Sequence, residues 1–344
     1  MELKGINKII IFNLGGIGDL LLSFPAVKAL RQTYPGASID IVVVERVKEL
    51  ALDLGLFSDV LVYRKNFLAD LSLFVSLGRK GYDLGINMRT IVSFFSALKI
   101  FTIMALVHPK ISAGRDTDHH GLFFDIKIPE TLYGEKHDTE YDIDLVTALG
   151  AKVTDRKVVF DIDGKSKQQA MKKIADNGIT GNDIVVGINA GGVLSHRWPL
   201  DNFEAVIKDM AGFKDVKFVL TGDASEAKYV DPLRRSLPDK VINLSGKLNL
   251  RELAAVIKRC SIYITNDTGP MHIAASLNVP LLAIFGPGYI KRFDPRAISD
   301  KAKVFYKAQD CAPCDRIRCV STRCLKAITP QEVSREARNI LSVM

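Results

Sequence analysis

The chain lacks the sequence features of several large protein classes. Its 344 residues contain only five cysteines, too few to indicate a disulfide-stabilised scaffold. It has no Lys/Arg-rich block, no aromatic–basic RNA motif and no helix-turn-helix signature, so nucleic acid is not the expected partner. Residues 1–7 contain no apolar core of a signal peptide, and we therefore expect the protein to remain in the cytoplasm.

The sequence also lacks a long uninterrupted apolar run. Residues 90–107 just reach the ~18 residues of a membrane-spanning helix, but Lys99 would then lie at mid-bilayer, where a charge is costly. We predict a helix that is buried or lies at an interface. The composition is otherwise globular, with 47% hydrophobic and 25% charged residues. The formal net charge of +8 favours anionic partners such as nucleotides, phosphorylated glycans or an acidic lipid surface.

Apolar runs alternate with amphipathic segments in both halves of the chain, and the length suggests two domains. In the first half we predict strands at 9–14, 38–45, 59–63, 82–87 and 110–114, and helices at 20–34, 46–54, 67–79, 90–107 and 138–149. In the second half we predict strands at 184–189, 216–221, 241–244, 261–265 and 279–285, and helices at 165–176, 201–212, 225–237, 250–259 and 270–277. This pattern predicts an α/β protein of two Rossmann-like, doubly wound domains, 1–165 and 166–344. Two such sheets facing each other would hold a ligand in a central cleft, at the carboxyl ends of the strands.

The stretch 261–287 combines a buried strand, the turn Asn266-Asp267-Thr268-Gly269, a short helix and a second buried strand. A strand, a turn and a helix N-terminus together make an anion site, because amide donors and the positive end of the helix dipole face one point. His272, one turn into the helix, favours a phosphate or pyrophosphate pocket. The alternative is that Asp267 and Thr268 only cap the helix.

A glycine-rich turn follows the first predicted strand. Gly15, Gly16 and Gly18 resemble a dinucleotide fingerprint, but Leu21 stands where the third glycine belongs. The glycines would let the backbone approach a ligand closely. Asp19, at the start of the next helix, is either a functional carboxylate or an N-cap.

Residues 14–30, LGGIGDLLLSFPAVKAL, resemble the N-terminal signature of glycosyltransferase family 9, the lipopolysaccharide heptosyltransferases. Arg197-Trp198-Pro199 and the segment 266–272 lie where that family carries its second and third motifs. The resemblance implies a GT-B fold, with an acceptor-side N-terminal domain and a nucleotide-sugar-binding C-terminal domain. It also implies inverting transfer of a heptose from ADP-heptose to the inner core of lipopolysaccharide. If the N–H donors at Thr268, Gly269 and the helix start suffice for the departing diphosphate, no metal ion or other cofactor is needed.

The resemblance also implies roles for individual residues. Asp19 matches the family's general base, which takes a proton from the acceptor hydroxyl. The implied donor-binding residues are Ser195, His196, Arg197, Glu226, Asp267, Thr268, Gly269 and His272. Family members often carry a phosphate-contacting lysine at the position of His196, so either His196 or Arg197 supplies that charge here, or the donor differs. For Glu226, which resembles the ribose-contacting acid, the alternative is a solvated glutamate in a first helical turn.

Three further features are open to a structural interpretation. Cys311, Cys314, Cys319 and Cys324 are close enough in sequence to bind zinc or a cluster, but we favour reduced structural thiols over a metal site. His119 and His120, with Asp116 and Asp118, indicate a loop over 115–121 on the acceptor side rather than a metal site. Trp198 is expected to be a packing residue, and Cys260 to be simply buried.

Several functions remain open from the sequence. The leading one is a heptosyltransferase that works on the cytoplasmic membrane surface without spanning it. A transferase for another nucleotide sugar, a related GT-B epimerase and a non-catalytic nucleotide-sugar binder are alternatives. An NAD-linked oxidoreductase is disfavoured by the missing third glycine and by the phosphate-type motif at 266–272.

Overall fold

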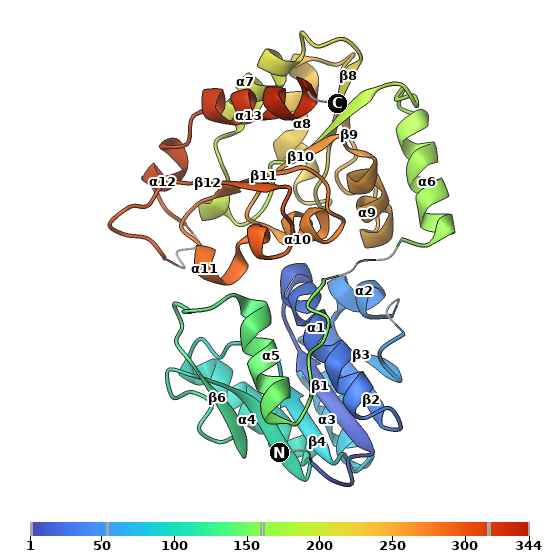
Figure 1. Ribbon diagram of the computed structural model, residues 1–344, viewed down its shortest axis with the longest axis vertical. Helices are drawn as coiled ribbons and strands as arrows, with labels where there is room; N and C mark the ends of the chain where they lie inside the picture. Colours follow the sequence, from blue (N-terminus) through green and yellow to red (C-terminus); the bar gives the residue numbers. More distant parts are fainter. Residues whose placement is uncertain (1–2, 53–54, 159, 161, 315–317, 343–344) are drawn as a thin grey trace. The chain divides into compact units, whose positions relative to one another are not determined.

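The chain folds into two compact α/β units, each built on one parallel sheet. The computed structural model describes residues 3–52, 55–158, 160, 162–314 and 318–342 (Figure 1). The first unit comprises Met1–Val159 together with the short segment Lys291–Phe293, and the second comprises Phe160–Ile290 and Asp294–Met344. Two six-stranded parallel sheets confirm the predicted α/β class.

In the first unit the strand order is β3-β2-β1-β4-β5-β6, and every neighbouring pair is parallel. The strands are β1 Lys8–Asn13, β2 Ser38–Val44, β3 Asp59–Tyr63, β4 Leu84–Asn87, β5 Ile111–Thr117 and β6 Ile126–Glu130. Because β1 pairs with both β2 and β4, the order of winding reverses between β1 and β4. Such a reversal is the usual place for a ligand in an open parallel sheet.

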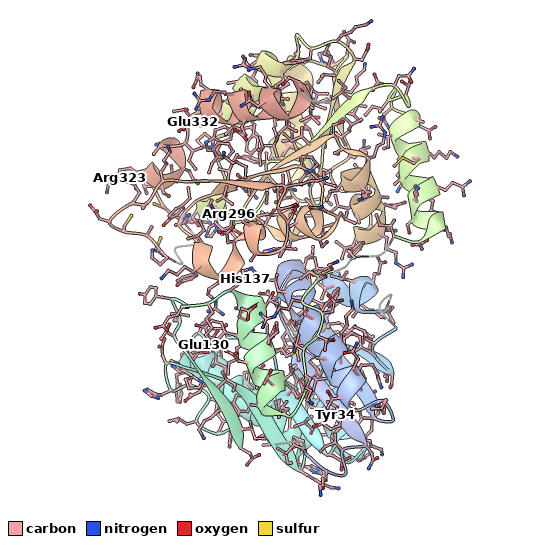
Figure 2. The ribbon with its side chains drawn as sticks, in the orientation of Figure 1. Tyr34, Glu130, His137, Arg296, Arg323 and Glu332 are labelled. Carbon is pink, nitrogen blue, oxygen red and sulfur yellow. The ribbon has the colours of Figure 1, made fainter. Side chains whose placement is uncertain are left out.

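The helices of the first unit cover both faces of this sheet (Figure 1). They are α1 Ile17–Thr33, α2 Lys48–Leu52 after the 3-10 turn Glu45–Val47, α3 Phe67–Gly78, α4 Phe94–Val107 and α5 Asp138–Ala148. On one face α1 packs with α5, and Tyr34 donates a hydrogen bond to the Leu149 carbonyl at 2.6 Å (Figure 2). On the other face Ile10 and Phe12 of β1 share a core with side chains of α3 and α4. Alternation along β1 thus supplies both cores.

In the second unit the strand order is β12-β11-β10-β7-β8-β9, again parallel throughout. The strands are β7 Ile184–Asn189, β8 Val216–Leu220, β9 Val241–Asn243, β10 Ile262–Asn266, β11 Leu281–Phe285 and β12 Ala302–Tyr306. The longer helices are α6 Gly164–Ala175, α7 Leu200–Met210, α8 Ala227–Ser236, α9 Leu250–Arg259, α10 Gly269–Ser276 and α13 Pro330–Ser342. The short ones are Leu194–His196, Pro295–Ala297 and α12 Arg323–Lys326. The short helix α11 Ile290–Phe293 begins in this unit, but Lys291–Phe293 belong to the first. The winding reverses here between β7 and β10.

Trp198 is a packing residue, as expected. It is fully buried in the core beneath α7 and α13, with its ring edge-on to Phe203. Its indole N–H donates to the Ile328 carbonyl at 3.0 Å, which satisfies the one polar atom of the side chain. The residue therefore fixes the segment before α7 to the C-terminal part of the unit.

The structure corrects the sequence prediction in three places. The predicted loop 115–121 is wrong in its first part, because β5 continues to Thr117, and β6 was not predicted at all. Charged residues at the end of β5 and in the edge strand β6 hide the apolar pattern that identifies a strand. The helix predicted at 46–54 is a 3-10 turn followed by α2, and residues 53–54 lie outside the described part. The elements after Gly288 were not predicted either, although Val333, Ala337 and Leu341 of α13 are buried and recur at helical spacing.

The apolar run 90–107 forms α4, which begins at Ser93. The Ser93 side chain accepts a hydrogen bond from the Ser96 N–H, and Ser96 caps Ser93 in return. One face of α4 is buried through Ile100, Ile103 and Met104. Among the helices of the described residues, none has the length and apolar character needed to cross a membrane.

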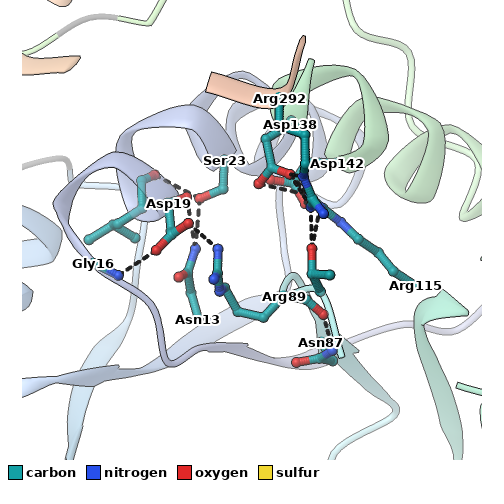
Figure 3. Close-up of polar contacts among 12 residues, drawn as sticks. Asn13, Gly16, Asp19, Ser23, Asn87, Arg89, Arg115, Asp138, Asp142 and Arg292 are labelled. Atoms are coloured by element: carbon teal, nitrogen blue, oxygen red, sulfur yellow. Dashed lines mark hydrogen bonds and ion pairs between the residues drawn. The ribbon is translucent and has the colours of Figure 1, made fainter. Parts of the chain in front are cut away.

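A buried charge cluster lies inside the first unit, under the β5–β6 edge. Arg115 is fully buried, and its guanidinium is 3.1 Å from Glu130, 2.9 Å from Asp138 and 2.6 Å from Asp142 (Figures 2 and 3). Arg292, from the segment Lys291–Phe293, adds contacts of 2.7 Å to Glu130 and 2.5 Å to Asp138. Two guanidinium groups thus face three carboxyl groups, so one carboxyl is in excess.

Asp142 binds a proton more readily than Asp138 does. Burial raises the pKa of Asp142 to about 7, and the nearby Asp138 charge adds to this, while Arg115 opposes it. Burial also acts on Asp138, but Arg115 and Arg292 outweigh it and lower the pKa of Asp138. Oδ2 of Asp142 is buried and has no hydrogen-bond partner among the described residues, which agrees with a carboxyl less well stabilised as an anion.

We predict that this proton makes stability depend on pH. The folded pKa of Asp142 lies above the ordinary value of 3.8, so its stabilisation is fully present below pH 3.8 and is lost by pH 7. Asp142→Asn has no proton to lose. The free energy of unfolding of the wild type, measured by denaturant titration, should therefore fall relative to that of Asp142→Asn between pH 4 and pH 7, on the order of a few kcal/mol.

The matched control is Asp144→Asn on the same helix, where Asp144 forms a half-exposed pair with Lys136. Its difference from the wild type should be small at every pH. A wild-type curve that stays parallel to that of Asp142→Asn over this range would contradict the assignment of the proton.

Candidate functional site

The first polar group of interest lies at the reversal between β1 and β4. Asn13 and Asn87 are the last residues of these two strands, Asp19 lies in the first turn of α1, and Arg89 follows β4 by two residues (Figure 3). All four side chains come from the carboxyl end of the sheet. The fold therefore gathers them where open parallel sheets bind ligands.

Asp19 is held through both carboxylate oxygens. Oδ2 accepts a hydrogen bond from the Gly16 N–H at 2.6 Å, and Oδ1 forms an ion pair with Arg89. The N-cap of α1 is Gly16, and Asp19 is the third helical residue, so the carboxylate does contribute to capping. Capping alone does not account for Arg89, and the Asp19 side chain remains 17% exposed. Asp19 is therefore both a structural and an accessible carboxylate.

Gly15 is required by the position of this carboxylate. A Cβ atom at residue 15 would lie 2.5 Å from Oδ2 of Asp19, well inside contact distance. A Cβ at Gly16 would lie 3.1 Å from the Arg46 guanidinium, a tight contact. Gly18 lies inside α1 rather than in the turn. The glycine-rich turn thus makes room for Asp19.

Two buried oxygens beside Asp19 lack partners. The amide of Asn13 donates to the Asp19 carbonyl and to Ser23, both at 3.2 Å, and that of Asn87 donates to the Arg89 carbonyl at 2.7 Å. The side-chain oxygens of Asn13 and Asn87 are buried without a hydrogen-bond partner among the described residues. A buried unpaired acceptor costs about 1–3 kcal/mol. Polar hydrogens of a ligand would remove that cost.

The second group lies in the second unit, in the loops that follow β7, β8 and β10. Glu226 precedes α8 and is buried, so the interpretation of a solvated glutamate is wrong. Its two oxygens accept hydrogen bonds from the Gly192 N–H at 2.5 Å and the Asp223 N–H at 3.1 Å. Arg197 lies 3.7 Å from Glu226 and 4.5 Å above the ring of Tyr229. A buried carboxylate and a stacked guanidinium thus adjoin each other.

Asp267 and Thr268 do more than cap α10. Thr268 is the N-cap, but its side chain makes no capping hydrogen bond and instead donates to Asn189 at 3.3 Å. Oδ2 of Asp267 lies 3.5 Å from Nδ1 of His196. The fold therefore joins the loop after β7 to the start of α10, and the capping alternative for these side chains is wrong.

The remaining predicted residues lie in the same group of loops. Gly269 begins α10, and His272 is buried in its first turn. Ser195 is buried, and its hydroxyl has no hydrogen-bond partner in the described part of the chain. The same holds for the hydroxyl of Ser245, which was not predicted. Unpaired buried hydroxyls again mark positions where a polar ligand would contribute.

The sequence analysis missed Asn13, Asn87, Arg89 and Tyr229. Asn13 and Asn87 carried a usable signal, because each is a polar residue that ends an apolar strand. Arg89 follows the second of these strands, so its approach to Asp19 could be expected once β1 and β4 are known to be neighbours. Tyr229 carried no usable signal in the sequence, since an aromatic residue in a helix ordinarily indicates a core position.

The cysteine and histidine clusters form no metal site in the described residues, where no three His, Cys, Asp or Glu side chains could hold an ion. His119 is largely exposed and lies 4.0 Å from Asp116. Residues 315–317, between Cys314 and Cys319, lie outside the described part. Burial raises the pKa of Cys260 to about 12, which fits the expected buried, unreactive thiol.

The chain is similar in sequence to curated heptosyltransferases. Lipooligosaccharide heptosyltransferase 2 of Campylobacter jejuni is 30% identical over 164 residues, which are 46% of this chain and 51% of that protein. The chain thus spans about half the length of the curated relatives it matches, those of Campylobacter jejuni and Haemophilus influenzae.

Solved structures agree over the whole chain. The glycosyl transferase family 9 protein of Veillonella parvula has a TM-score of 0.80 at 24% identity and covers 100% of this chain and 99% of its own. The ADP-heptose LPS heptosyltransferase II of E. coli has a TM-score of 0.76 at 22% identity, covering 97% and 98%. These likenesses confirm the GT-B-like fold.

A family model settles the membership. Residues 71–324 match glycosyltransferase family 9 (heptosyltransferase), which is more than half of the chain. The match includes the loops after β7, β8 and β10 that carry the second polar group. The resemblance seen in the three sequence motifs is therefore confirmed, and the chain belongs to glycosyltransferase family 9 (heptosyltransferase).

Proposed function

We propose that the protein transfers a heptose from ADP-heptose to the core of lipopolysaccharide or lipooligosaccharide, with inversion at the anomeric carbon. The family membership and the names of its relatives support the reaction class. The observation that carries the proposal is the Asp19 carboxylate, fixed by Gly16 and Arg89 beside two unpaired buried amide oxygens. A site of this kind suits a sugar hydroxyl that must be oriented and deprotonated.

The acceptor step uses Asp19 as general base. The acceptor oxygen attacks the anomeric carbon and forms the new glycosidic bond as the bond to the diphosphate oxygen breaks. The hydroxyl proton passes to Asp19, and the electron pair of the broken bond leaves with the diphosphate. Asn13 and Asn87 accept hydrogen bonds from other hydroxyls of the acceptor and so orient it. Each group then has one role.

The departing diphosphate needs positive charge and N–H donors. The start of α10, at Thr268 and Gly269, supplies donors and the positive end of a helix dipole. His196 is next to this helix start through its contact with Asp267. Since these groups can meet the charge of the leaving group, we propose that the transfer is metal-independent.

The nucleoside end of the donor is assigned to Glu226 and its neighbours. Its carboxylate is fixed by two backbone N–H groups, so it presents a rigid acceptor to the ribose hydroxyls. Arg197 pairs with Glu226 rather than with Asp267. We therefore assign the role of the family's lysine to His196, which lies on the Asp267 side, and Arg197 to the nucleoside side.

One observation favours a second candidate, a transferase for another nucleotide sugar. The replacement of the phosphate-contacting lysine by His196 changes the charge beside the diphosphate, and this would suit a different donor. An NAD-linked oxidoreductase is not favoured. In the first unit the N-terminal turn of α1 already holds the Asp19 carboxylate, whose negative charge would repel a pyrophosphate.

The proposed reaction also suggests where the protein works. A lipopolysaccharide core acceptor is an anionic glycolipid, and the chain carries a formal net charge of +8. We propose peripheral contact with the cytoplasmic face of the inner membrane, held in part by this charge.

Asp19→Asn tests the base. Asparagine can still accept from the Gly16 N–H, so this capping interaction survives, while the proton acceptor and the negative charge that pairs with Arg89 are lost. Turnover at saturating ADP-heptose should fall by ~10²–10⁴, while the dissociation constant for ADP changes little. Purified protein, donor and deacylated core acceptor, read by mass spectrometry, provide the measurement. Turnover within a few-fold of the wild type would mean that Asp19 is only a cap.

Gly15→Ala tests the position of the same carboxylate without removing it. The new Cβ would overlap the Asp19 side chain, which must move. Because a shift of about 1 Å can cost ~10² in rate, turnover should fall by that order while the melting temperature changes little. Gly36→Ala is the control, since nothing lies within 4 Å of a Cβ at that position. Equal turnover of the two variants would argue against the proposed geometry.

Asp267→Asn tests the donor side. The wild-type melting temperature should rise with ADP or ADP-heptose and not with NAD. The variant loses the carboxylate that orients His196, so its dissociation constant for ADP-heptose should increase roughly tenfold, a loss of ~1.4 kcal/mol. Turnover at saturating donor should stay within a few-fold of the wild type. A melting temperature that responds to NAD instead would contradict the proposed function.

A further inference from the structure

The outer face of α4 is apolar, which is unusual for a helix on a protein surface. Phe94 is 68% exposed, Phe95 80%, Leu98 49% and Phe101 50%. On α3, which packs beside α4, Leu71 and Val75 are also exposed. Surface helices normally present charged and polar residues to water, and contiguous exposed apolar patches mark interaction sites.

A groove runs between these two helices. It has a volume of about 440 Å³, with Phe74, Leu98 and Ile103 among its apolar walls and Lys65 and Lys99 at its edge. Lys99 lies 5.8 Å from the ring centre of Tyr63. Among the described residues neither lysine has a carboxylate partner within ion-pair distance. The surface thus combines exposed hydrocarbon with two positive charges that are not neutralised locally.

The charges around Lys99 are all of one sign except for the buried Asp70. Burial lowers the pKa of Lys99, and the charges of Lys65 and Arg89 add to this effect. Asp70 lines the groove, but one of its oxygens accepts the Arg64 N–H at 2.9 Å. The two lysines therefore outnumber the one carboxylate in the lining of the groove.

We propose that this face, named here the α3–α4 face and comprising Leu71, Val75, Phe94, Phe95, Leu98 and Phe101 with Lys65 and Lys99, docks on an anionic lipid bilayer. The aromatic and aliphatic side chains enter the interface between headgroups and acyl chains, while the two lysines contact lipid phosphates. The inference rests on the proposed function, because a membrane-bound acceptor requires the enzyme to meet the lipid surface.

A second copy of this chain fits the face less well. In a two-fold dimer the same patch would meet itself, and Lys65 and Lys99 of both copies would come together without a counter-charge. A bilayer rich in acidic lipids supplies hydrocarbon and negative charge in the same surface. Phe94, the first residue of α4, follows Arg89 by five residues. Docking would therefore bring the lipid headgroups to the end of the unit that carries Asp19.

The test is co-sedimentation with vesicles of phosphatidylcholine, with and without phosphatidylglycerol. The wild type should bind vesicles that contain phosphatidylglycerol, and high salt should weaken this binding. The double variant Phe95→Ser with Leu98→Ser should bind at least roughly tenfold more weakly, because it loses two exposed apolar side chains of the face. Its control is Leu52→Ser on α2, also about half exposed, which should bind as the wild type does.

The lysines are tested separately. The double variant Lys65→Gln with Lys99→Gln should lose roughly 30-fold in affinity for phosphatidylglycerol vesicles, the usual effect of two interfacial charges. Lys152→Gln with Lys157→Gln removes the same charge from exposed positions elsewhere in the unit. An equal loss in that control would show that only net charge matters and would overturn the proposal.

Two measurements keep this inference separate from the proposed function. Transfer to a deacylated, soluble acceptor should be unchanged in Phe95→Ser with Leu98→Ser, since docking is then not needed. If the wild type transfers no heptose, the proposed function is refuted. Vesicle binding does not depend on transfer, so it would still test the α3–α4 face. The docking proposal would be overturned in favour of self-association by two results together. The wild type would not bind vesicles, and analytical ultracentrifugation would show a dimer for the wild type and a monomer for this variant.

Discussion

The reversal of winding in the middle of each parallel sheet is the constraint on which the rest of the structure depends. Where β1 and β4, or β7 and β10, lie side by side, their following loops diverge to opposite faces of the sheet. The divergence leaves backbone and side chains at the strand ends open to a ligand. In both units the polar residues with unusual contacts, Asp19 in the first and Asp267 in the second, lie in the segments that follow these strands.

In the first unit the charge of Arg89 acts both on Asp19 and on the buried cluster around Arg115. Arg89 forms an ion pair with Asp19, and its charge also acts on Asp138 and Asp142. The effect on Asp138 and Asp142 acts through space and lowers the pKa of both carboxyl groups. Asp19 itself is held by two direct contacts, one from the Gly16 N–H and one from Arg89 (Figure 3).

The sequence predicted what depends on local pattern and missed what depends on distant partners. Apolar runs identified ten of the strands, and the ordered motifs around Asp19, Arg197 and Asp267 identified the family. The predicted strand at 110–114 ended before Arg115, because a charged residue is typical of a loop when its carboxylate partners are not known. The position of Arg292 could not be expected either, since Asp138, which it contacts, is 154 residues away in sequence. Such pairs are created by the fold, and no period in the sequence encodes them.

The short connection from β4 to α4 contributes to both the candidate site around Asp19 and the proposed membrane-docking face. Its first residues, Asn87 and Arg89, belong to the polar group around Asp19, and its end, Ser93, caps a helix whose outer face is apolar. Packing explains only the buried side of α4, where Ile100 and Met104 join the core. Phe94 and Phe95 are 68% and 80% exposed and contribute little to that core, and contiguous exposed apolar side chains mark interaction sites. An enzyme that takes its acceptor from a lipid surface would benefit if the helix that meets the surface and the arginine that pairs with the proposed base followed the same strand, as α4 and Arg89 follow β4.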